Sequence, residues 1–268
     1  MLFSSFQVMM SKMFNINLFS KRKRYGHINR IDFDSFRSFQ YSGSDRDIYL
    51  TPTGWKILID KVLSPVIEKE LGMTYLGNGY WADSFNNHRR RVLSLFYINN
   101  AFATFKWGWN FDFVPVKSGK RLVYARTDKC VYSHIFEMSS DFYNNTEKRK
   151  HTIIGAYGGE ISHYNASMNA MCKSYVDAFY FLLPLIRDYY KKTDSYNNTL
   201  KCIEHNLEND YLKIINYDMT VARVFIEYAS GNCKSALSHF EDIGFTDDDI
   251  KNKYLRALHK LDDAEKII

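Results

Sequence analysis

Apolar and polar residues alternate along residues 101–116, AFATFKWGWNFDFVPV. The apolar row consists of Ala101, Ala103, Phe105, Trp107, Trp109, Phe111 and Phe113. The polar row between them consists of Thr104, Lys106, Gly108, Asn110 and Asp112. Successive side chains of a strand point to opposite faces of a sheet, so this pattern predicts a strand with an aromatic row in the core. The polar row, above all Lys106, Asn110 and Asp112, is then expected to stay free for binding.

Turn signals divide the surrounding sequence into short segments rich in Tyr, Trp, Val, Leu and Phe. Turns are predicted at Gly77-Asn78-Gly79, Asn86-Asn87, Asn99-Asn100 and residues 117–120. Two further strands are expected at residues 122–126 and 131–137. Such short connections favour antiparallel pairing, since a parallel crossover needs about a dozen residues or more, so we expect a meander of about four to six strands.

A helix is predicted before the sheet, at residues 52–71. Apolar residues recur there three to four positions apart, which is typical of an amphipathic helix that covers one face of a sheet. Thr51 and Pro52 suit the start of this helix, and Gly72 suits its end. Pro65 lies inside it and lacks the N–H that a helix uses, so we expect a kink or a break near Leu63.

Helical periodicity replaces the alternation in the second half of the chain. Apolar residues keep one face from Tyr164 to Tyr190, with a kink or a new helix expected at Pro184. Further helices are predicted at residues 200–215, 220–229, 234–242 and 246–261. The predicted fold class is α+β, with an antiparallel meander sheet covered by an N-terminal helix and followed by an all-helical C-terminal half.

Three regions follow from these elements. Residues 1–50 are expected to be a basic leader with a short helix, partly disordered. Residues 51–142 form the helix and the antiparallel sheet, and residues 143–268 form a helical region packed on the sheet.

Composition is that of a soluble globular protein, because 46% of the 268 residues are hydrophobic and 25% are charged. Cys130, Cys172, Cys202 and Cys233 lie far apart without zinc-site spacing, so we expect buried thiols in a reducing, cytoplasmic compartment. No apolar run reaches the ~20 residues that span a bilayer, so no transmembrane segment is expected. The sequence also contains no phosphate loop or metal-binding signature, and we expect no cofactor and no metal.

Basic residues exceed acidic ones, which gives a formal net charge of +6. Much of the excess lies in three runs, at residues 21–24, 89–91 and 148–150. One hypothesis is therefore nucleic-acid binding through Arg89, Arg90, Arg91 and neighbouring lysines, with exposed Tyr or Trp side chains as stacking platforms. The alternative is that these runs are solvated surface or loop tips, because a binding surface needs charges that cluster in space.

Candidate catalytic residues are Asp112, Asp128, His134 and Glu137, which could share the polar face of the sheet. A metal-dependent hydrolase or nuclease would need such a gathering of acids and a histidine. The alternative is that this face is wet and that its charges pair across strands.

Residues 106–115, KWGWNFDFVP, follow a helix that ends in Glu70-Leu71-Gly72. On these residues, together with Leu183-Pro184 and the helical pair at residues 222–240, the chain resembles an uncharacterised group of bacterial proteins, the domain-of-unknown-function family numbered four-three-zero-four. The resemblance covers about residues 51–243 and implies a helix, an antiparallel sheet, a leucine-proline helix and a late helical hairpin. It supplies no catalytic residues. Genes of this kind are often strain-variable, like those for toxin immunity or phage defence.

The leading hypothesis is a protein-binding module without enzymatic activity, acting as a bacterial toxin-immunity or phage-defence component. Aromatic residues make up 16% of the chain, and Tyr, Trp and Phe are favoured anchors in protein interfaces. The expected partner is another protein, such as a toxin or a defence component. The residues predicted to bind it are Lys106, Asn110, Asp112, Arg89, Arg90 and Arg91.

Overall fold

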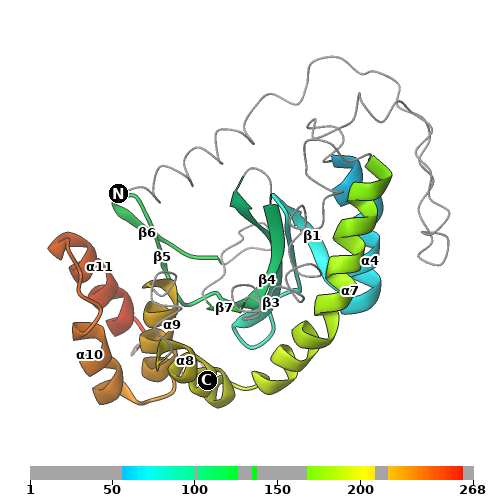
Figure 1. The fold of residues 1–268 in the computed structure, drawn as a ribbon. Helices are drawn as coiled ribbons and strands as arrows, with labels where there is room; N and C mark the ends of the chain where they lie inside the picture. The colour runs from blue at the N-terminus through cyan, green and yellow to red at the C-terminus, as the bar shows by residue number, and fades with distance from the viewer. Residues whose placement is uncertain (1–55, 100–101, 126–134, 138–167, 209–216, 262–268) are drawn as a thin grey trace.

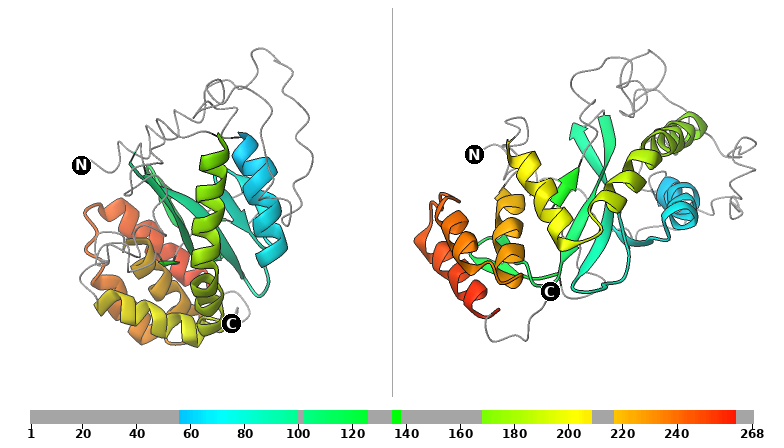
Figure 2. Two further views of the ribbon diagram at one scale, coloured as in Figure 1. Left: turned by 45° about the vertical axis from the view of Figure 1, so that its right-hand side comes forward. Right: turned by 90° about the horizontal axis from the view of Figure 1, so that it is seen from below.

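A computed structural model describes residues 56–99, 102–125, 135–137, 168–208 and 217–261. An antiparallel sheet stands at its centre, with helices α4 (Ser64–Leu71) and α7 (Met168–Lys192) side by side along one face (Figure 1). The helices from α8 (Tyr196–Glu208) to α11 (Asp248–His259) gather away from them. The two further views in Figure 2 show the same separation. The predicted α+β class is confirmed. No helix in these ranges is both long and apolar enough to cross a membrane.

The strands in these ranges form one large and one small sheet. The large sheet has the order β1-β2-β3-β4-β7, with every pair antiparallel. Its strands are β1 Thr74–Gly77, β2 Tyr80–Ala82, β3 Arg89–Asn99, β4 Phe102–Phe111 and β7 Ile135–Glu137. Strands β5 Val116–Ser118 and β6 Arg121–Val123 pair with each other as a separate hairpin. The antiparallel meander is therefore present from β1 to β4, and β7 adds to its β4 edge.

The strand predicted over residues 101–116 is shorter than expected. β4 ends at Phe111, and the chain bends over residues 112–114 before β5 begins at Val116. The Asp112 backbone N–H still donates to the His88 carbonyl oxygen, at 3.1 Å. Pro115 then follows, and it has no N–H to give to a ladder. The prediction of one continuous strand up to residue 116 is therefore wrong.

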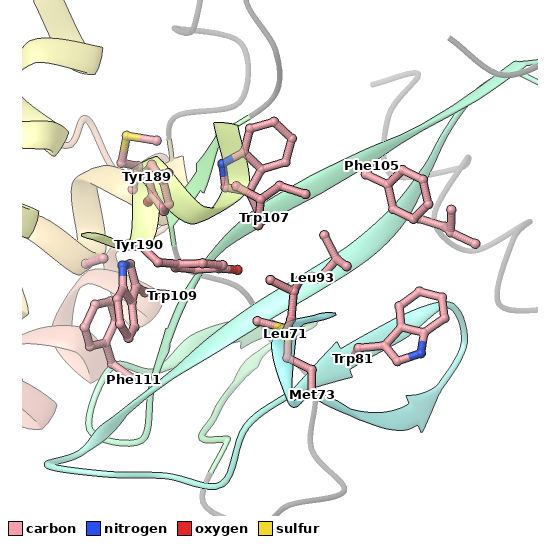
Figure 3. Packing of buried hydrophobic residues seen from close by; sticks show 14 of the residues in the cluster. Leu71, Met73, Trp81, Leu93, Phe105, Trp107, Trp109, Phe111, Tyr189 and Tyr190 are labelled. Atoms are coloured by element: carbon pink, nitrogen blue, oxygen red, sulfur yellow. The ribbon is translucent and has the colours of Figure 1, made fainter. Parts of the chain in front are cut away.

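The aromatic row of β4 lies in the core, as the alternation predicts. Its buried members are Ala103, Phe105, Trp107, Trp109 and Phe111. Helix α7, Met168–Lys192, packs on this row, with ring centroids 5.7 Å apart for Phe105 and Phe179 and 5.6 Å apart for Trp109 and Tyr190. Figure 3 shows Trp107, Trp109 and Tyr190 on this side of the sheet. The sequence predicted that the N-terminal helix covers one face of the sheet and that a later helical region packs on the sheet, and α7 is the helix of that region that contacts the aromatic row.

The N-terminal helix is described from residue 56 to Leu71, and its hydrogen bonding changes part way along. Residues Leu58–Leu63 form the π-helix η2, and Ser64–Leu71 form the α-helix α4. The Ser64 N–H donates to the Ile59 carbonyl, five residues back, and Pro65 then stands in the first turn of α4. The irregularity expected near Leu63 is thus a π segment. Gly72 ends the helix with φ 72° and an N–H bond of 2.9 Å to the Glu68 carbonyl, a left-handed conformation that glycine adopts readily.

The C-terminal half is helical in the ranges that the structure describes. After α7 come α8 Tyr196–Glu208, α9 Tyr217–Ala229, α10 Cys233–Glu241 and α11 Asp248–His259. Helix α7 runs through Pro184 without a second helix starting there. Asp247 caps α11 by accepting the Ile250 N–H at 3.2 Å. Helix α9 contacts β7 of the large sheet, and α11 contacts β6 of the small hairpin. Residues 1–55, with the predicted leader and its short helix, lie outside the described ranges.

Replacing Trp107 tests the central position of the aromatic row. Trp107 is fully buried, so Trp107→Ala should lower the free energy of unfolding by about 3–5 kcal/mol, as large-to-small core substitutions do. Trp107→Phe should cost clearly less, because the described structure shows no hydrogen-bond partner for the indole Nε1. Urea unfolding followed by circular dichroism measures both variants. A Trp107→Ala protein as stable as the parent would place this side chain outside the core.

Candidate functional site

The three consecutive arginines of β3 do not form one basic surface. Arg89, Arg90 and Arg91 pair with successive residues of β4, so their side chains alternate between the two faces of the sheet. Arg90 is only 1% exposed, and its Nε donates to Oδ1 of Asn110 at 2.9 Å. Its guanidinium also lies 4.4 Å from the ring centroid of Phe85. The hypothesis that all three arginines contact nucleic acid together is therefore wrong, because the charge of Arg90 is buried inside the protein.

The polar row of β4 needs a similar correction. Asn110 is fully buried and Thr104 is 2% exposed, while Lys106 is half-buried. Buried polar groups are normally hydrogen-bonded, and the Arg90–Asn110 bond gives each of these two residues a partner. The expectation of a free polar face is therefore wrong for Asn110. Asp112 remains accessible at the end of the row, with its side chain 25% exposed.

Arg91 fastens the sheet to the helix before it. Its Nε lies 2.6 Å from an Asp83 carboxylate oxygen, and a terminal nitrogen donates to the Leu71 carbonyl at 3.0 Å. Burial by itself lowers the pKa of Arg91, but the hydrogen bond and the charge of Asp83 outweigh it, and the pKa is raised. Leu71 ends α4, so this contact satisfies one of the carbonyls that a helix end leaves open. Arg91 is therefore a structural residue here.

Arg89 occupies a different environment, at the end of the paired strands β3 and β4. Its guanidinium carbon lies 4.3 Å from the ring centroid of Trp109 and 5.1 Å from that of Tyr196. One terminal nitrogen donates to the Thr193 carbonyl at 3.2 Å. Burial lowers the pKa of Arg89, and the neighbouring Tyr196 and Asp194 act in the opposite direction. The described structure gives this half-buried cation no carboxylate within salt-bridge distance.

The turn beside Arg89 holds an exposed histidine against a carboxylate. Asn87 and His88 have φ angles of 47° and 62°, and the flanking Asn86 and Arg89 exchange backbone hydrogen bonds of 2.9 and 3.1 Å. Positive φ at both central residues is what a two-residue type I′ hairpin turn requires. The His88 Nδ1 lies 3.1 Å from both Asp112 carboxylate oxygens, and the His88 side chain is 48% exposed.

Tyr196 ties this turn to the helices. Its hydroxyl donates to the Asn87 carbonyl from the first turn of α8, and its ring faces Phe111 with the centroids 6.0 Å apart. Burial raises the pKa of the Tyr196 phenol, while the charge of Arg89 lowers it. Asn87, His88, Arg89, Asp112 and Tyr196 thus form one continuous region, which we call the ribbon-end surface.

The ribbon-end surface can support two kinds of chemistry. An imidazole whose Nδ1 is held by a carboxylate, with the rest of its ring in solvent, is the arrangement of a general base. A desolvated arginine stacked on aromatic rings and an exposed histidine are equally suited to receive polar groups of a partner.

The predicted catalytic group is not brought together in the described part of the chain. Glu137 pairs with Trp107 in the register of β4 and β7, five residues along the strand from Asp112. At about 3.3 Å per residue, that separation is on the order of 16 Å. Asp128 and His134 lie outside the described residues. Within the described ranges, no three His, Cys, Asp or Glu side chains gather as a metal site would need.

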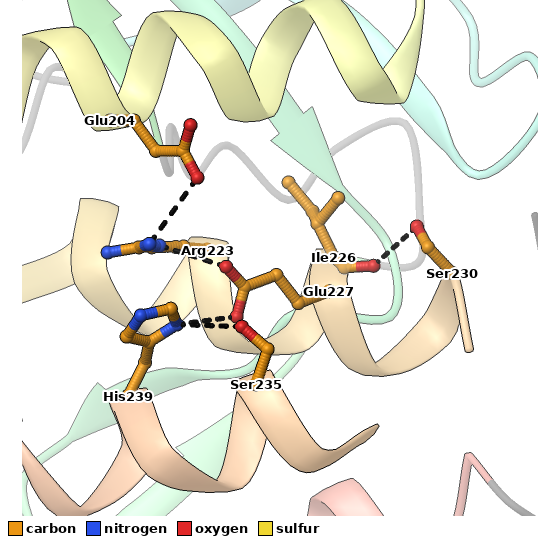
Figure 4. A network of polar contacts seen from close by, with 7 residues as sticks. All are labelled: Glu204, Arg223, Ile226, Glu227, Ser230, Ser235 and His239. Carbon is orange, nitrogen blue, oxygen red and sulfur yellow. Dashed lines mark hydrogen bonds and ion pairs between the residues drawn. The ribbon is translucent and has the colours of Figure 1, made fainter. Parts of the chain in front are cut away.

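A second polar cluster joins α8, α9 and α10 (Figure 4). The buried Glu227 carboxylate lies 3.0 Å from Arg223 Nε and 2.8 Å from His239 Nδ1, and Arg223 also reaches Glu204 at 3.4 Å. Ser235 Oγ lies 3.5 Å from the same His239 Nδ1. A Ser-His-acid relay needs the serine and the acid on opposite ring nitrogens, so this cluster is not one as it stands. The cluster instead links the three helices through polar contacts.

His88 was not predicted from the sequence. β3 pairs with β4 in a register in which Arg89 faces Phe111, and extending that register by one residue places His88 opposite Asp112. The register is irregular between Tyr97 and Asn99, so the turn predicted at Asn99-Asn100 does not by itself give this pairing. The contacts of Tyr196 and Thr193 have no local signal in the sequence, because these residues lie at the start of α8 and just after α7, about a hundred residues further along the chain.

Replacing His88 with glycine separates turn stability from surface chemistry. Asn-Gly is the favoured pair for a type I′ turn, and an exposed polar contact is worth little, so His88→Gly should leave the free energy of unfolding within about 1 kcal/mol of the parent. Chemical unfolding of the two proteins measures the difference. A loss above about 2 kcal/mol would show that the His88–Asp112 contact is needed for the fold.

No protein-family model, no curated protein and no solved structure matches this chain. The resemblance to the uncharacterised bacterial family therefore stays an expectation from the sequence. The fold and the ribbon-end surface are argued from the chain's own geometry.

Proposed function

We propose that this protein acts by binding another protein, and that the ribbon-end surface is the place where the partner docks. The observation that carries the proposal is the Arg89 guanidinium, which lies half-buried against Trp109 and Tyr196 without a carboxylate partner in the described structure. A charge taken out of water is costly unless it is paired. A carboxylate of a bound protein would supply the missing partner.

The composition of the ribbon-end surface supports the same proposal. Binding energy in protein interfaces concentrates in Trp, Tyr and Arg side chains set in well-packed surroundings. Tyr196 and Arg89 are such residues, and contacts to Asn87, Thr193 and Trp109 already hold them in place. Side chains held in this way lose little conformational entropy when a partner binds.

The His88–Asp112 pair extends the surface outward. His88 can donate to a partner through the exposed part of its ring, while Asp112 holds the ring in position. Together with Arg89, this arrangement favours a partner that presents an acidic or carbonyl-rich segment. A toxin or a phage-defence component is the biological class of partner that we propose, with the protein acting as an immunity or defence protein in the cytoplasm.

Affinity capture from the native host tests this proposal. Tagged parent protein should retain a specific partner, and His88→Gly should reduce the captured amount at least about tenfold, because it removes a contact at the surface while leaving the turn intact. Lys201→Ala serves as the control, since Lys201 is exposed on α8 and belongs to neither the ribbon-end surface nor an ion pair in the described structure.

Two outcomes would contradict the proposal. Capture of no other protein by the parent at any salt concentration would contradict the existence of a partner. Equal capture by the parent, His88→Gly and Lys201→Ala would show that the partner does not bind at the ribbon-end surface.

A further inference from the structure

A group of exposed cations stands at the tip of the β5–β6 hairpin, away from the arginines of β3. Lys117 lies in β5, Lys120 lies in the turn, and Arg121 begins β6. All three residues are exposed. Lys117 pairs with Leu122 and Arg121 pairs with Ser118, so the side chains of Lys117 and Arg121 leave opposite faces of the hairpin on either side of its turn. Gly119 has φ 60°, a conformation that glycine adopts readily, and it lets the turn present the neighbouring lysine outward.

Helix α11 brings two more cations to this hairpin. The Lys253 Nζ donates to the Lys120 carbonyl oxygen at 2.7 Å, so the two lysines meet at the turn. Arg256 follows three positions later, on the same side of the helix and about 4.5 Å further along its axis. The Nε of Arg256 donates to the Asn252 carbonyl at 3.2 Å, and its side chain is exposed. We call Lys117, Lys120, Arg121, Lys253 and Arg256 the hairpin-helix patch.

The members of this patch lie close to one another without an acidic partner. Several other cations of the described chain are matched with acids, as in Lys173–Asp177, Arg187–Glu70 and Lys251–Glu241, whereas isolated lysines such as Lys191 and Lys201 are not. For the hairpin-helix patch, the described structure shows backbone carbonyls as partners and no carboxylate within salt-bridge distance. Glu241, an acid close to α11, is already held by Lys251. Like charges that gather without counter-charges repel one another, and a polyanion would relieve that repulsion.

The chemistry of the hairpin-helix patch distinguishes among polyanions. A protein interface needs an apolar or aromatic centre, and the exposed large apolar side chains of the described chain lie on α7 and α10 rather than here: Phe181, Leu185 and Leu237. Single-stranded nucleic acid is held by bases stacked on aromatic rings, which this patch lacks. Lysine and arginine contacts to phosphate oxygens need neither feature, and they are independent of base sequence.

We propose that the hairpin-helix patch binds the phosphate backbone of duplex nucleic acid without sequence specificity. The hairpin turn and one side of α11 would each contact phosphates of the duplex. This binding is separate from the proposed docking of a protein at the ribbon-end surface, and neither depends on the other.

Fluorescence anisotropy with labelled duplexes of two unrelated sequences tests the proposal on the full chain. Between about 50 and 200 mM salt, log Kd should rise with log salt with a slope of at least about 3, as expected for three or more phosphate contacts, and both sequences should bind equally. The double variant Lys120→Glu/Arg256→Glu should bind at least about tenfold more weakly and lower the slope by about 2. Lys120→Gln/Arg256→Gln should show the same loss of slope without added negative charge.

The matched control is Lys191→Glu/Lys201→Glu, which changes the net charge by the same amount at exposed lysines of α7 and α8. It should keep affinity within about threefold of the parent, because long-range charge effects are screened beyond about 10 Å. Equal losses in patch and control variants, or no duplex binding by the parent, would overturn the proposal. Binding to poly-L-glutamate as tight as to the duplex would overturn it in favour of an acidic protein partner.

Discussion

The register between β3 and β4 is the constraint on which the rest of the structure depends. It pairs Leu93 with Trp107 and Arg89 with Phe111. A shift of one residue would turn every side chain of a strand to the opposite face. The same register therefore buries the aromatic row under α7, sends Arg90 to one face and its two neighbours to the other, and sets His88 beside Asp112. Core packing and the surface at the strand ends follow from this one pairing.

Much of this could be predicted from the sequence where a single period or turn decides the outcome. The alternation in residues 102–111 identified β4 and its buried face, and Gly72 marked the end of α4. The same period should have separated the three arginines, because neighbours in a strand cannot share a face. A basic run inside a strand therefore does not predict one basic surface.

Other features depend on contacts that no local pattern encodes. The hydroxyl of Tyr190 donates to the Val92 carbonyl at 2.8 Å, and Thr193 receives the indole N–H of Trp109 at 2.8 Å, so the end of α7 fixes the end of the sheet. The turn at residues 117–120 and a strand after it were predicted, but the end of β4 at Phe111 was not, since Phe113 continues the apolar row and is buried as well. Tertiary packing, rather than strand pairing, explains the burial of Phe113.

Residues that hold the fold together are distinct from those that we propose to contact a partner. Arg90, Arg91 and Glu227 each have internal partners, whereas Arg89 lies half-buried on aromatic rings without a carboxylate in the described structure. Photo-cross-linking in the native host from His88→p-benzoylphenylalanine tests this separation most directly. We expect a covalent adduct with one other protein from position 88 and none from position 201. An adduct from position 201 alone, or from neither position, would contradict the assignment of the ribbon-end surface as the binding site.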